Sequence, residues 1–443
     1  MVAAFVFLTA WDLLGAREVK TEQRIDSKTL FELVKLSFGV VAGAGALVAL
    51  VVAYRRQRVD EDGALRDATR LHTERFTTAV SQLGDDSAAV RLGGVHALAG
   101  LADDAPTRDL RQTCIDVLCA YLRLPYTPET DLPDDDTTAR HTYLALREVR
   151  HTVIRLIRDH LRLPTEHPSS WQGHDLDFTG VTFDGGDFSK VTVSGGTVSF
   201  VGASFCSGLI SFAGADFSGG KVSFTAATFS GGTVDFRNAK FSGGRSDFLK
   251  ATFCGSDINF ARATFSGNVH FTGASFSSGR INFAWTTFSS GEVDFAWTTF
   301  SGSGVDFDGA AFSGGKVFFA TTTHAGGATF SGGTVSFGGV TFSGSEVHFG
   351  ASTFSGGAVL FTGADFPGGR VRFDGTTFSG SDVYFTGATF SGGEVSFVGA
   401  LFSGSEVNFP GASGSVPYGL VPEDGSPLPA GLTLPPAWRP AGL

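Results

Sequence analysis

Phenylalanine recurs with a fixed rhythm between residues 177 and 410, and this rhythm constrains the fold more than any other feature of the chain. Successive phenylalanines are separated alternately by five and seven residues, as in Phe200, Phe205, Phe212 and Phe217. The alternation defines a twelve-residue unit, V-x-F-x-x-A-x-F-S-G-G-x, and 39 of the 44 phenylalanines lie in this segment. A fixed period of this kind indicates a repeat array in which each unit packs on its neighbours.

Each phenylalanine follows a smaller residue two positions earlier, as in Val222-Ser-Phe224 and Ala227-Thr-Phe229. Because positions i−2 and i share one face of a strand, we expect both side chains to point inward and the polar residue between them to face solvent. Glycine-rich turns separate these short strands. One unit cannot bury its aromatic rings alone, so the copies are expected to stack into a solenoid with ladders of identical side chains.

The first part of the array carries a family resemblance. Phe178, Phe183, Phe188 and Val193 have pure five-residue spacing, and Ala-Asp-Phe217 resembles the A-[DN]-[LF] core of pentapeptide-repeat proteins, as does Ala-Asp-Phe366. The resemblance implies a mainly β fold, a right-handed quadrilateral β-helix solenoid with four faces per coil. This chain departs from the family pattern by two extra residues at every second corner. We therefore expect 24 residues, two units, to form one coil, with roughly ten coils in all at about 4.8 Å each.

Residues 36–54 form a stretch of nineteen residues without a charge, followed at once by Arg55, Arg56 and Arg58. Such a stretch is long enough to span about 30 Å of hydrocarbon, so it predicts a transmembrane helix. Gly39 and Gly43 have GxxxG spacing, which is explained either by glycine tolerated in a membrane helix or by a dimer face.

Residues 2–16 are a second apolar segment, shorter and interrupted by Asp12. We favour a marginal membrane segment here, and a signal peptide is the competing interpretation, although its basic start is missing. Arg55, Arg56 and Arg58 favour a cytoplasmic repeat domain at the cell membrane. The basic residues of the loop before the predicted helix weigh against this orientation.

The flanking segments complete four predicted domains. Residues 1–58 are the membrane anchor, 59–165 a small α-helical adaptor, 166–410 the β-helix and 411–443 a proline- and glycine-rich tail. An amphipathic helix over residues 142–163 is expected to cap the first coil, because an uncapped solenoid end would expose a layer of rings. The tail is expected to fold over the last coil through Leu420 or Trp438.

The net charge and the positions of the four cysteines exclude some classes of function and of cellular location. The net charge is −11, and residues 177–410 contribute about −6 from 17 acidic and 11 basic residues. An acidic balance argues against a nucleic-acid-binding surface. Cys206 and Cys254 lie two predicted coils apart, too far for a disulfide, and Cys114 and Cys119 lie on a predicted helix. Reduced cysteines agree with a cytoplasmic location.

No catalytic, cofactor-binding or metal-binding motif stands out. The segment Gly302-Ser-Gly-Val-Asp-Phe-Asp308 faintly resembles a calcium-binding β-roll turn, but it occurs once. The histidines of the helical region have no ligand spacing. Outward threonines such as Thr228 and Thr252 are explained equally by a hydroxyl ladder and by the strand propensity of threonine. The chain is therefore interpreted as a non-enzyme.

Candidate partner contacts are two tryptophans and two pairs of aspartates. Trp285 and Trp297 are expected to be exposed at corners, and the aspartate pairs, Asp235 with Asp247 and Asp294 with Asp306, to form short acidic rows. These features favour a membrane-tethered β-helical scaffold for protein–protein interaction. The expected partners are the lipid bilayer, an unidentified protein, and a second copy joined through the membrane helix or the β-helix end. The alternative is a DNA-mimicking modulator of a type II topoisomerase, as the resemblance implies for some soluble relatives.

Overall fold

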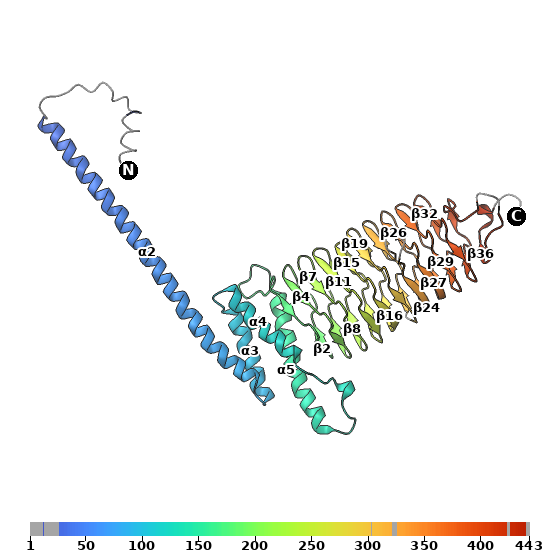
Figure 1. The fold of residues 1–443 in the computed structure, drawn as a ribbon, viewed down its shortest axis with the longest axis horizontal. Helices are drawn as coiled ribbons and strands as arrows, with labels where there is room; N and C mark the ends of the chain where they lie inside the picture. The colour runs from blue at the N-terminus through green and yellow to red at the C-terminus, as the bar shows by residue number, and fades with distance from the viewer. Residues whose placement is uncertain (1–11, 13–25, 303, 321–325, 423–425, 440–443) are drawn as a thin grey trace. The chain divides into compact units, whose positions relative to one another are not determined.

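The computed structural model describes residues 12, 26–302, 304–320, 326–422 and 426–439 (Figure 1). The segment 2–16, apart from Asp12, lies outside the described residues, so the second membrane segment remains a prediction. The chain divides into two compact units, residues 1–71 and residues 72–443. The helices from His72 onward and the β-helix belong to the same unit.

Helix α2 (Ser27–Leu83) is continuous, so the predicted boundary at residues 58 and 59 falls inside it. The apolar side chains of its segment 36–54 are exposed, including Leu36, Phe38 and Val41. Within the described part of the chain, α2 is the one helix that is long and apolar enough to cross a membrane. It ends at Leu83, directly before Gly84 and two aspartates.

Four further helical segments precede the strands. They are α3 (Ala88–Asp103), α4 (Arg108–Arg123), the short 3₁₀ helix η2 (Glu129–Asp131) and α5 (Thr137–Leu161). Side-chain caps begin two of them: Thr107 accepts the backbone N–H of Leu110 at 3.3 Å, and Asp136 accepts that of Ala139 at 2.9 Å. Each cap satisfies an N–H group that the helix itself leaves unpaired.

The repeat array forms a parallel β-solenoid with four faces per coil, as predicted. Face I consists of β1 (Leu176–Asp177), β4 (Thr197–Ser199), β7 (Lys221–Ser223), β11 (Arg245–Asp247), β15 (Asn268–His270), β19 (Glu292–Asp294), β23 (Lys316–Phe318), β26 (Glu346–His348), β28 (Arg370–Arg372) and β32 (Glu394–Ser396). Face II consists of β2 (Thr182–Phe183), β5 (Ser204–Phe205), β8 (Thr228–Phe229), β12 (Thr252–Cys254), β16 (Ser275–Ser278), β20 (Thr299–Phe300), β29 (Thr377–Phe378) and β33 (Leu401–Phe402).

Face III consists of β3 (Gly186–Asp187), β6 (Leu209–Ser211), β9 (Thr233–Asp235), β13 (Asp257–Asn259), β17 (Arg280–Asn282), β21 (Gly304–Asp306), β30 (Asp382–Tyr384), β34 (Glu406–Asn408) and β36 (Leu432–Thr433). Strands β24 (Thr329–Ser336) and β27 (Thr353–Leu360) run from face II through the corner into face III. Face IV consists of β10 (Lys240–Phe241), β14 (Thr264–Phe265), β18 (Thr287–Phe288), β22 (Ala311–Phe312), β25 (Thr341–Phe342), β31 (Thr389–Phe390) and β35 (Ser413–Gly414).

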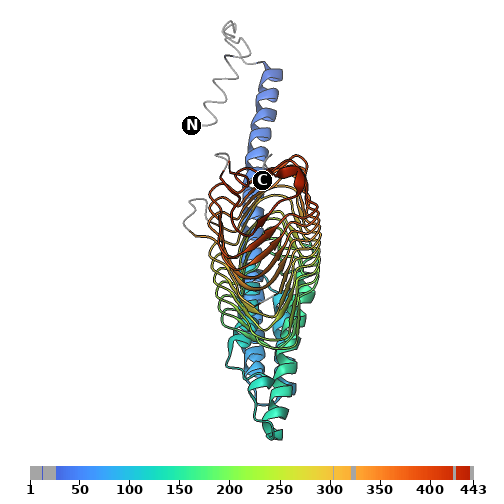
Figure 2. The ribbon, with the colours of Figure 1, turned by 90° about the vertical axis from the view of Figure 1, so that its right-hand side faces the viewer.

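The register confirms that one coil contains two sequence units. Val198 pairs with Val222, 24 residues later, and this step is the standard one. The first coil on face I is shorter, with Leu176 beside Val198, a step of 22. A deletion gives a step of 23 from Ser246 to Val269. These variations leave the inward phenylalanines in line, because Phe178 still stacks on Phe200 and Phe248 on Phe271. The stacked coils of the backbone can be followed in Figures 1 and 2.

Phenylalanine rings fill the interior as four ladders. Phe200 stacks on Phe224 of the next coil, with ring centroids 4.7 Å apart and planes 3° from parallel. Across the coil, Phe200 meets Phe212 edge to face at 88°. Both rings are fully buried. Stacked and edge-to-face pairs are the arrangements that aromatic quadrupoles favour, and each such pair adds about 0.5–1.5 kcal/mol beyond burial alone.

Tight and wide corners alternate around each coil. At a tight corner the Ala203 N–H donates to the Phe200 carbonyl at 3.1 Å, and Gly202 has a φ of +62°. At a wide corner the coils nearly touch: a methyl group at Gly219 would lie 2.0 Å from the Ser194 carbonyl oxygen. The two extra residues predicted at every second corner therefore form the wide corners, and glycine is required there by close approach.

Helices cover the first coil and the tail covers the last. The buried stripe of α5 includes Val149 and Ile157, and its C-terminal Leu161 carbonyl accepts the Thr192 N–H at 3.2 Å. At the other end Trp438 lies edge to face against Phe390, with centroids 5.4 Å apart, and Leu420 is buried. Both caps agree with the sequence-based expectation, because an open end would expose a ring layer to water.

A buried carboxylate joins the helical cap to the β-helix. Asp184 follows β2 and accepts hydrogen bonds from the hydroxyls of Tyr126 and Tyr143, at 2.5 and 2.7 Å. His151 lies 3.4 Å away and Arg147 3.6 Å away. Burial opposes ionisation, but the hydrogen bonds from His151 and the two tyrosines outweigh it and lower the pKa of Asp184 to about 2.

Replacing Asp184 by Asn is expected to destabilise this junction, because the two tyrosine hydroxyls lose a charged acceptor. The lowered pKa corresponds to roughly 2 kcal/mol of folding stability. This contribution is complete above the unfolded pKa of 3.8 and is lost as the pH falls toward about 2. Chemical unfolding of the full-length chain in detergent, measured from pH 7 to pH 2, should show the difference between wild type and D184N shrinking below pH 4.

The exposed Asp382 offers a matched control, since D382N removes a carboxylate from the surface of β30. We expect D382N to unfold as the wild type does at each pH. An unchanged stability of D184N at pH 7 would contradict the proposed role of the junction.

Candidate functional site

The two tryptophans predicted as contact points lie at tight corners, where both have positive φ angles of about +60°. Trp285 follows the face III strand β17, and Trp297 follows the face I strand β19. Tight corners alternate with wide ones, so these two corners are diagonally opposite. The side chains are 65% and 57% exposed, as expected, but the structure does not bring them together into one site.

Each tryptophan ring covers the backbone of the following coil. A methyl group at Gly309 would lie 2.8 Å from Cε3 of Trp285, and one at Gly326 would lie 2.1 Å from Cε2 of Trp297. A bulky residue at positive φ is conformationally costly, by about 1–2 kcal/mol. Contact between the ring and the next corner offsets part of this cost, so one face of each ring is already occupied.

The aspartate pairs predicted as acidic rows are split between faces. Asp247 and Asp294 lie on face I, whereas Asp235 and Asp306 lie on face III. Residues twelve apart are half a coil apart, so the members of each pair point in opposite directions. The expectation of rows formed by Asp235 with Asp247, and by Asp294 with Asp306, is therefore wrong.

Asp235 and Asp247 are also buried rather than solvent-facing. Their residues are 5% and 3% exposed, because neighbouring arginines fold over them. Arg237 binds Asp235 with an Nη2–Oδ2 distance of 2.7 Å, and Arg245 binds Asp247 with an Nε–Oδ1 distance of 2.6 Å. Their carboxylates are consequently neutralised within the rod, while Asp306 remains half-buried with Arg280 at 3.6 Å.

Among the described residues, face I carries charged side chains on most of its strands. Two columns of outward residues run along it, one at the first position and one at the third position of each strand. The first column reads Lys221, Arg245, Asn268, Glu292, Lys316, Glu346, Arg370, Glu394. The third-position column reads Ser223, Asp247, His270, Asp294, Phe318, His348, Arg372, Ser396.

Ion pairs along the first column link adjacent coils. Lys316 Nζ lies 3.9 Å from Glu346, and Arg370 Nε lies 3.0 Å from Glu394. Within one strand, Glu346 also contacts His348 at 3.1 Å. Burial opposes ionisation of Glu346, but the hydrogen bond from His348 and the charges of His348 and Lys316 lower its pKa. Face I therefore presents acidic and basic side chains at fixed positions.

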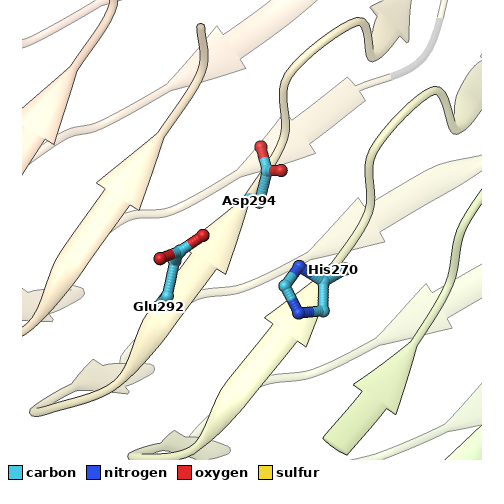
Figure 3. Close-up of side chains that lie close together, drawn as sticks. All are labelled: His270, Glu292 and Asp294. Atoms are coloured by element: carbon cyan, nitrogen blue, oxygen red, sulfur yellow. The ribbon is translucent and has the colours of Figure 1, made fainter. Parts of the chain in front are cut away.

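His270, Glu292 and Asp294 form a group of potential metal ligands in the middle of face I (Figure 3). The three side chains come from neighbouring strands β15 and β19 and are all half-buried. One ligand atom from each lies within 4.8 Å of the others. Sequence reasoning missed this group because 22 and 24 residues separate its members, and only the coil period places them side by side.

Face II presents a contrasting surface of hydroxyl groups. Its outward column consists of Thr and Ser up to the last strand, where Leu401 follows: Thr182, Ser204, Thr228, Thr252, Ser275, Thr299, Thr329, Thr353, Thr377. Charge is absent from this column, so faces I and II of the same coils differ sharply in chemistry. Face II can therefore serve as an uncharged control surface when the charged residues of face I are altered.

The four cysteines are free thiols, as predicted. Burial raises the pKa of Cys114 to about 11 and that of Cys119 to about 12. Such thiols remain protonated near neutral pH and are poor nucleophiles. They are therefore core residues of α4 rather than parts of a reactive site.

Comparison with protein families identifies the repeats. The family described as "Pentapeptide repeats (9 copies)" matches residues 178–228. This segment covers the first coils of the β-solenoid, and the recognition of pentapeptide repeats from the sequence is confirmed. No curated protein and no solved structure matches the chain.

Alanine substitutions at two corner glycines test whether the Trp285 ring packs on the next coil. Gly309 and Gly387 both follow face III strands and have φ near +66° and +65°, but only Gly309 is covered by a tryptophan. G387A should cost about 1 kcal/mol through its φ angle alone. G309A should cost more, because the new methyl group displaces the Trp285 ring. Unfolding free energies of both variants measure the difference.

Repeating the G309A substitution in a chain without the Trp285 ring shows how much of its cost arises from that ring. In a W285A background, the cost of G309A should fall to that of G387A. Equal costs for the two glycine substitutions in the wild-type background would show that Trp285 does not lie against the next coil.

Proposed function

We propose that this protein is a non-enzymatic, membrane-tethered scaffold, whose β-helix presents face I to a protein partner. The observation that carries the proposal is the pair of charged columns on face I, fixed at one strand spacing per coil. Pentapeptide-repeat β-solenoids generally have structural or interaction roles, which agrees with this class.

Rigidity is the physical basis of the proposed recognition. Each third-position residue of face I lies in sequence between two buried inward residues, as His348 does between Val347 and Phe349, and each first-position residue directly precedes one of these buried residues. The backbone is therefore ordered before binding, and docking costs little additional conformational entropy. The alternating signs favour a partner with a complementary pattern and disfavour uniformly charged ligands.

The proposed tether is helix α2. Its uncharged segment 36–54 leaves apolar side chains exposed, and Arg55, Arg56 and Arg58 follow directly. Exposed apolar surface of this extent is unfavourable in water and is accommodated by a bilayer. The arginines support a cytoplasmic repeat domain, and Gly39 with Gly43 supports pairing of two membrane helices.

The topoisomerase alternative gains no support from the faces. A DNA mimic needs continuous rows of free carboxylates, because phosphate charges dominate protein–DNA affinity. Here Asp235 and Asp247 are held by arginines, and face I alternates between acidic and basic residues. We therefore propose only the scaffold.

Exchanging the chemistry of one face at a time tests the docking proposal. R370Q/R372Q/E394Q removes charges from face I, while T329V/T353V/T377V changes the same number of residues on face II. With the full-length chain fused to a labelling enzyme in its native membrane, the face I variant should lose a specifically labelled protein about tenfold. The face II variant should retain it. Loss in the face II variant alone would contradict the proposal.

Removal of the helix tests the tether separately. A chain lacking residues 1–58, and with them the predicted second segment 2–16, should leave the membrane pellet, whereas the full-length chain should resist extraction with alkaline carbonate. In a chain lacking residues 1–25, substituting two leucines of the segment by arginine (L47R/L50R) should have the same effect, because each charge at the helix centre costs about 3 kcal/mol. Soluble behaviour of the unmodified full-length chain would overturn the tether.

A further inference from the structure

His270, Glu292 and Asp294 differ from the other acidic positions of face I in their surroundings. His270 of β15 lies directly beside Asp294 of β19 in the parallel ladder, and Glu292 precedes Asp294 on the same outward side (Figure 3). Their ligand atoms lie within 4.8 Å of one another. In the described part of the chain, none of the three side chains is hydrogen-bonded or ion-paired to another member of the group.

The two carboxylates lack a cation, unlike the other acids of the outward columns. Asp247 pairs with Arg245 and Glu394 with Arg370. Lys316, the register neighbour of Glu292 on β23, lies 3.9 Å from Glu346 instead. Among the described residues, Glu292 and Asp294 have no lysine or arginine within ion-pair distance. Two neighbouring carboxylates without a counter-charge repel each other.

The flanking residues offer no neutralising group either. The side chain of Asn268 is the acceptor for the Glu292 backbone N–H at 3.1 Å, and Phe318 occupies the position next to Asp294 on β23. On the other side of His270, the carboxylate of Asp247 is occupied by Arg245. The cluster is therefore a local negative patch with one imidazole at its edge.

The aspartate is held in place before any ligand binds. Its Oδ1 accepts the Ala296 backbone N–H at 2.7 Å, and its Oδ2 accepts the Thr272 hydroxyl at 2.8 Å. A carboxylate has further lone pairs, so both bonds leave room for a metal ion. Such partners orient a ligating carboxylate. Beneath the strands, Phe271 and Phe295 stack with centroids 4.8 Å apart and fix the backbone.

We propose that His270, Glu292 and Asp294 bind one divalent transition-metal ion. One imidazole nitrogen and two carboxylate oxygens suit Zn²⁺, Co²⁺, Ni²⁺ and Mn²⁺ better than Mg²⁺ or Ca²⁺, which prefer oxygen ligands alone. The ion neutralises the two carboxylates and joins adjacent coils through β15 and β19. Its remaining coordination positions face outward from face I, open to water or to a ligand atom supplied from outside.

The test uses the full-length chain in detergent, purified without a polyhistidine tag and stripped with a chelator. Loss of the electron paramagnetic resonance signal of free Mn²⁺ measures binding, and Zn²⁺, Mg²⁺ and Ca²⁺ are added as competitors. The wild type should bind one Mn²⁺ more per chain than H270Q/E292Q/D294N. Zn²⁺ should displace this ion at a lower concentration than either Mg²⁺ or Ca²⁺.

Single substitutions and a control on the same face complete the experiment. H270Q, E292Q and D294N should each lower the Mn²⁺ affinity of the site that the triple variant lacks by at least about tenfold. E346Q/H348Q removes a carboxylate and an imidazole two strands further along face I and should leave it intact. Circular dichroism of each variant confirms that the β-helix is retained.

Three results would overturn the proposal. They are equal binding by the wild type and the triple variant, loss of the site in E346Q/H348Q, and displacement of Mn²⁺ by Mg²⁺ or Ca²⁺ as readily as by Zn²⁺.

Discussion

Ring stacking along the solenoid axis is the interaction on which the rest of the structure depends. Each phenylalanine of an inner ladder lies one strand spacing from its counterparts, as Phe224 does from Phe248 at 4.7 Å. Crossed contacts such as Phe224 with Phe236 at 85° tie the ladders of opposite faces together. The rings fix the register of every coil, and the register decides which outward residues become neighbours. Surface chemistry on this protein is therefore a consequence of core packing.

The inward-facing side chains of the β-helix could be predicted from the sequence, because every second residue of a strand is buried. Val222 and Phe224 point inward simply because a strand alternates its side chains. The helical cap and the tail followed from the need to cover a terminal ring layer. The Asp184 junction could not be predicted, since Tyr126, Tyr143 and His151 reach it from separate segments.

Outward residues were harder to place, because their surroundings depend on coil length and on long side chains. Asp235 has an outward position in the repeat, yet Arg237 folds over it and buries it. Trp285 and Trp297 occur at matching points of consecutive units, which the coil places at opposite corners. The pairing of His270 with Asp294 follows only when the coil step is known. Residues that form a surface site on this β-helix are thus about one coil apart in sequence, and a search for short sequence motifs does not find them.

A double-mutant cycle measures the stacking interaction most directly. Phe224 and Phe248, stacked in one ladder, are each replaced by leucine, singly and together, and unfolding free energies of the full-length chain are compared. Stacking predicts a coupling of about 0.5–1.5 kcal/mol for this pair. Phe224 and Phe361, several coils apart on different faces, should show a coupling near zero. Equal couplings for the two pairs, or none for the stacked pair, would contradict the role of the aromatic ladders.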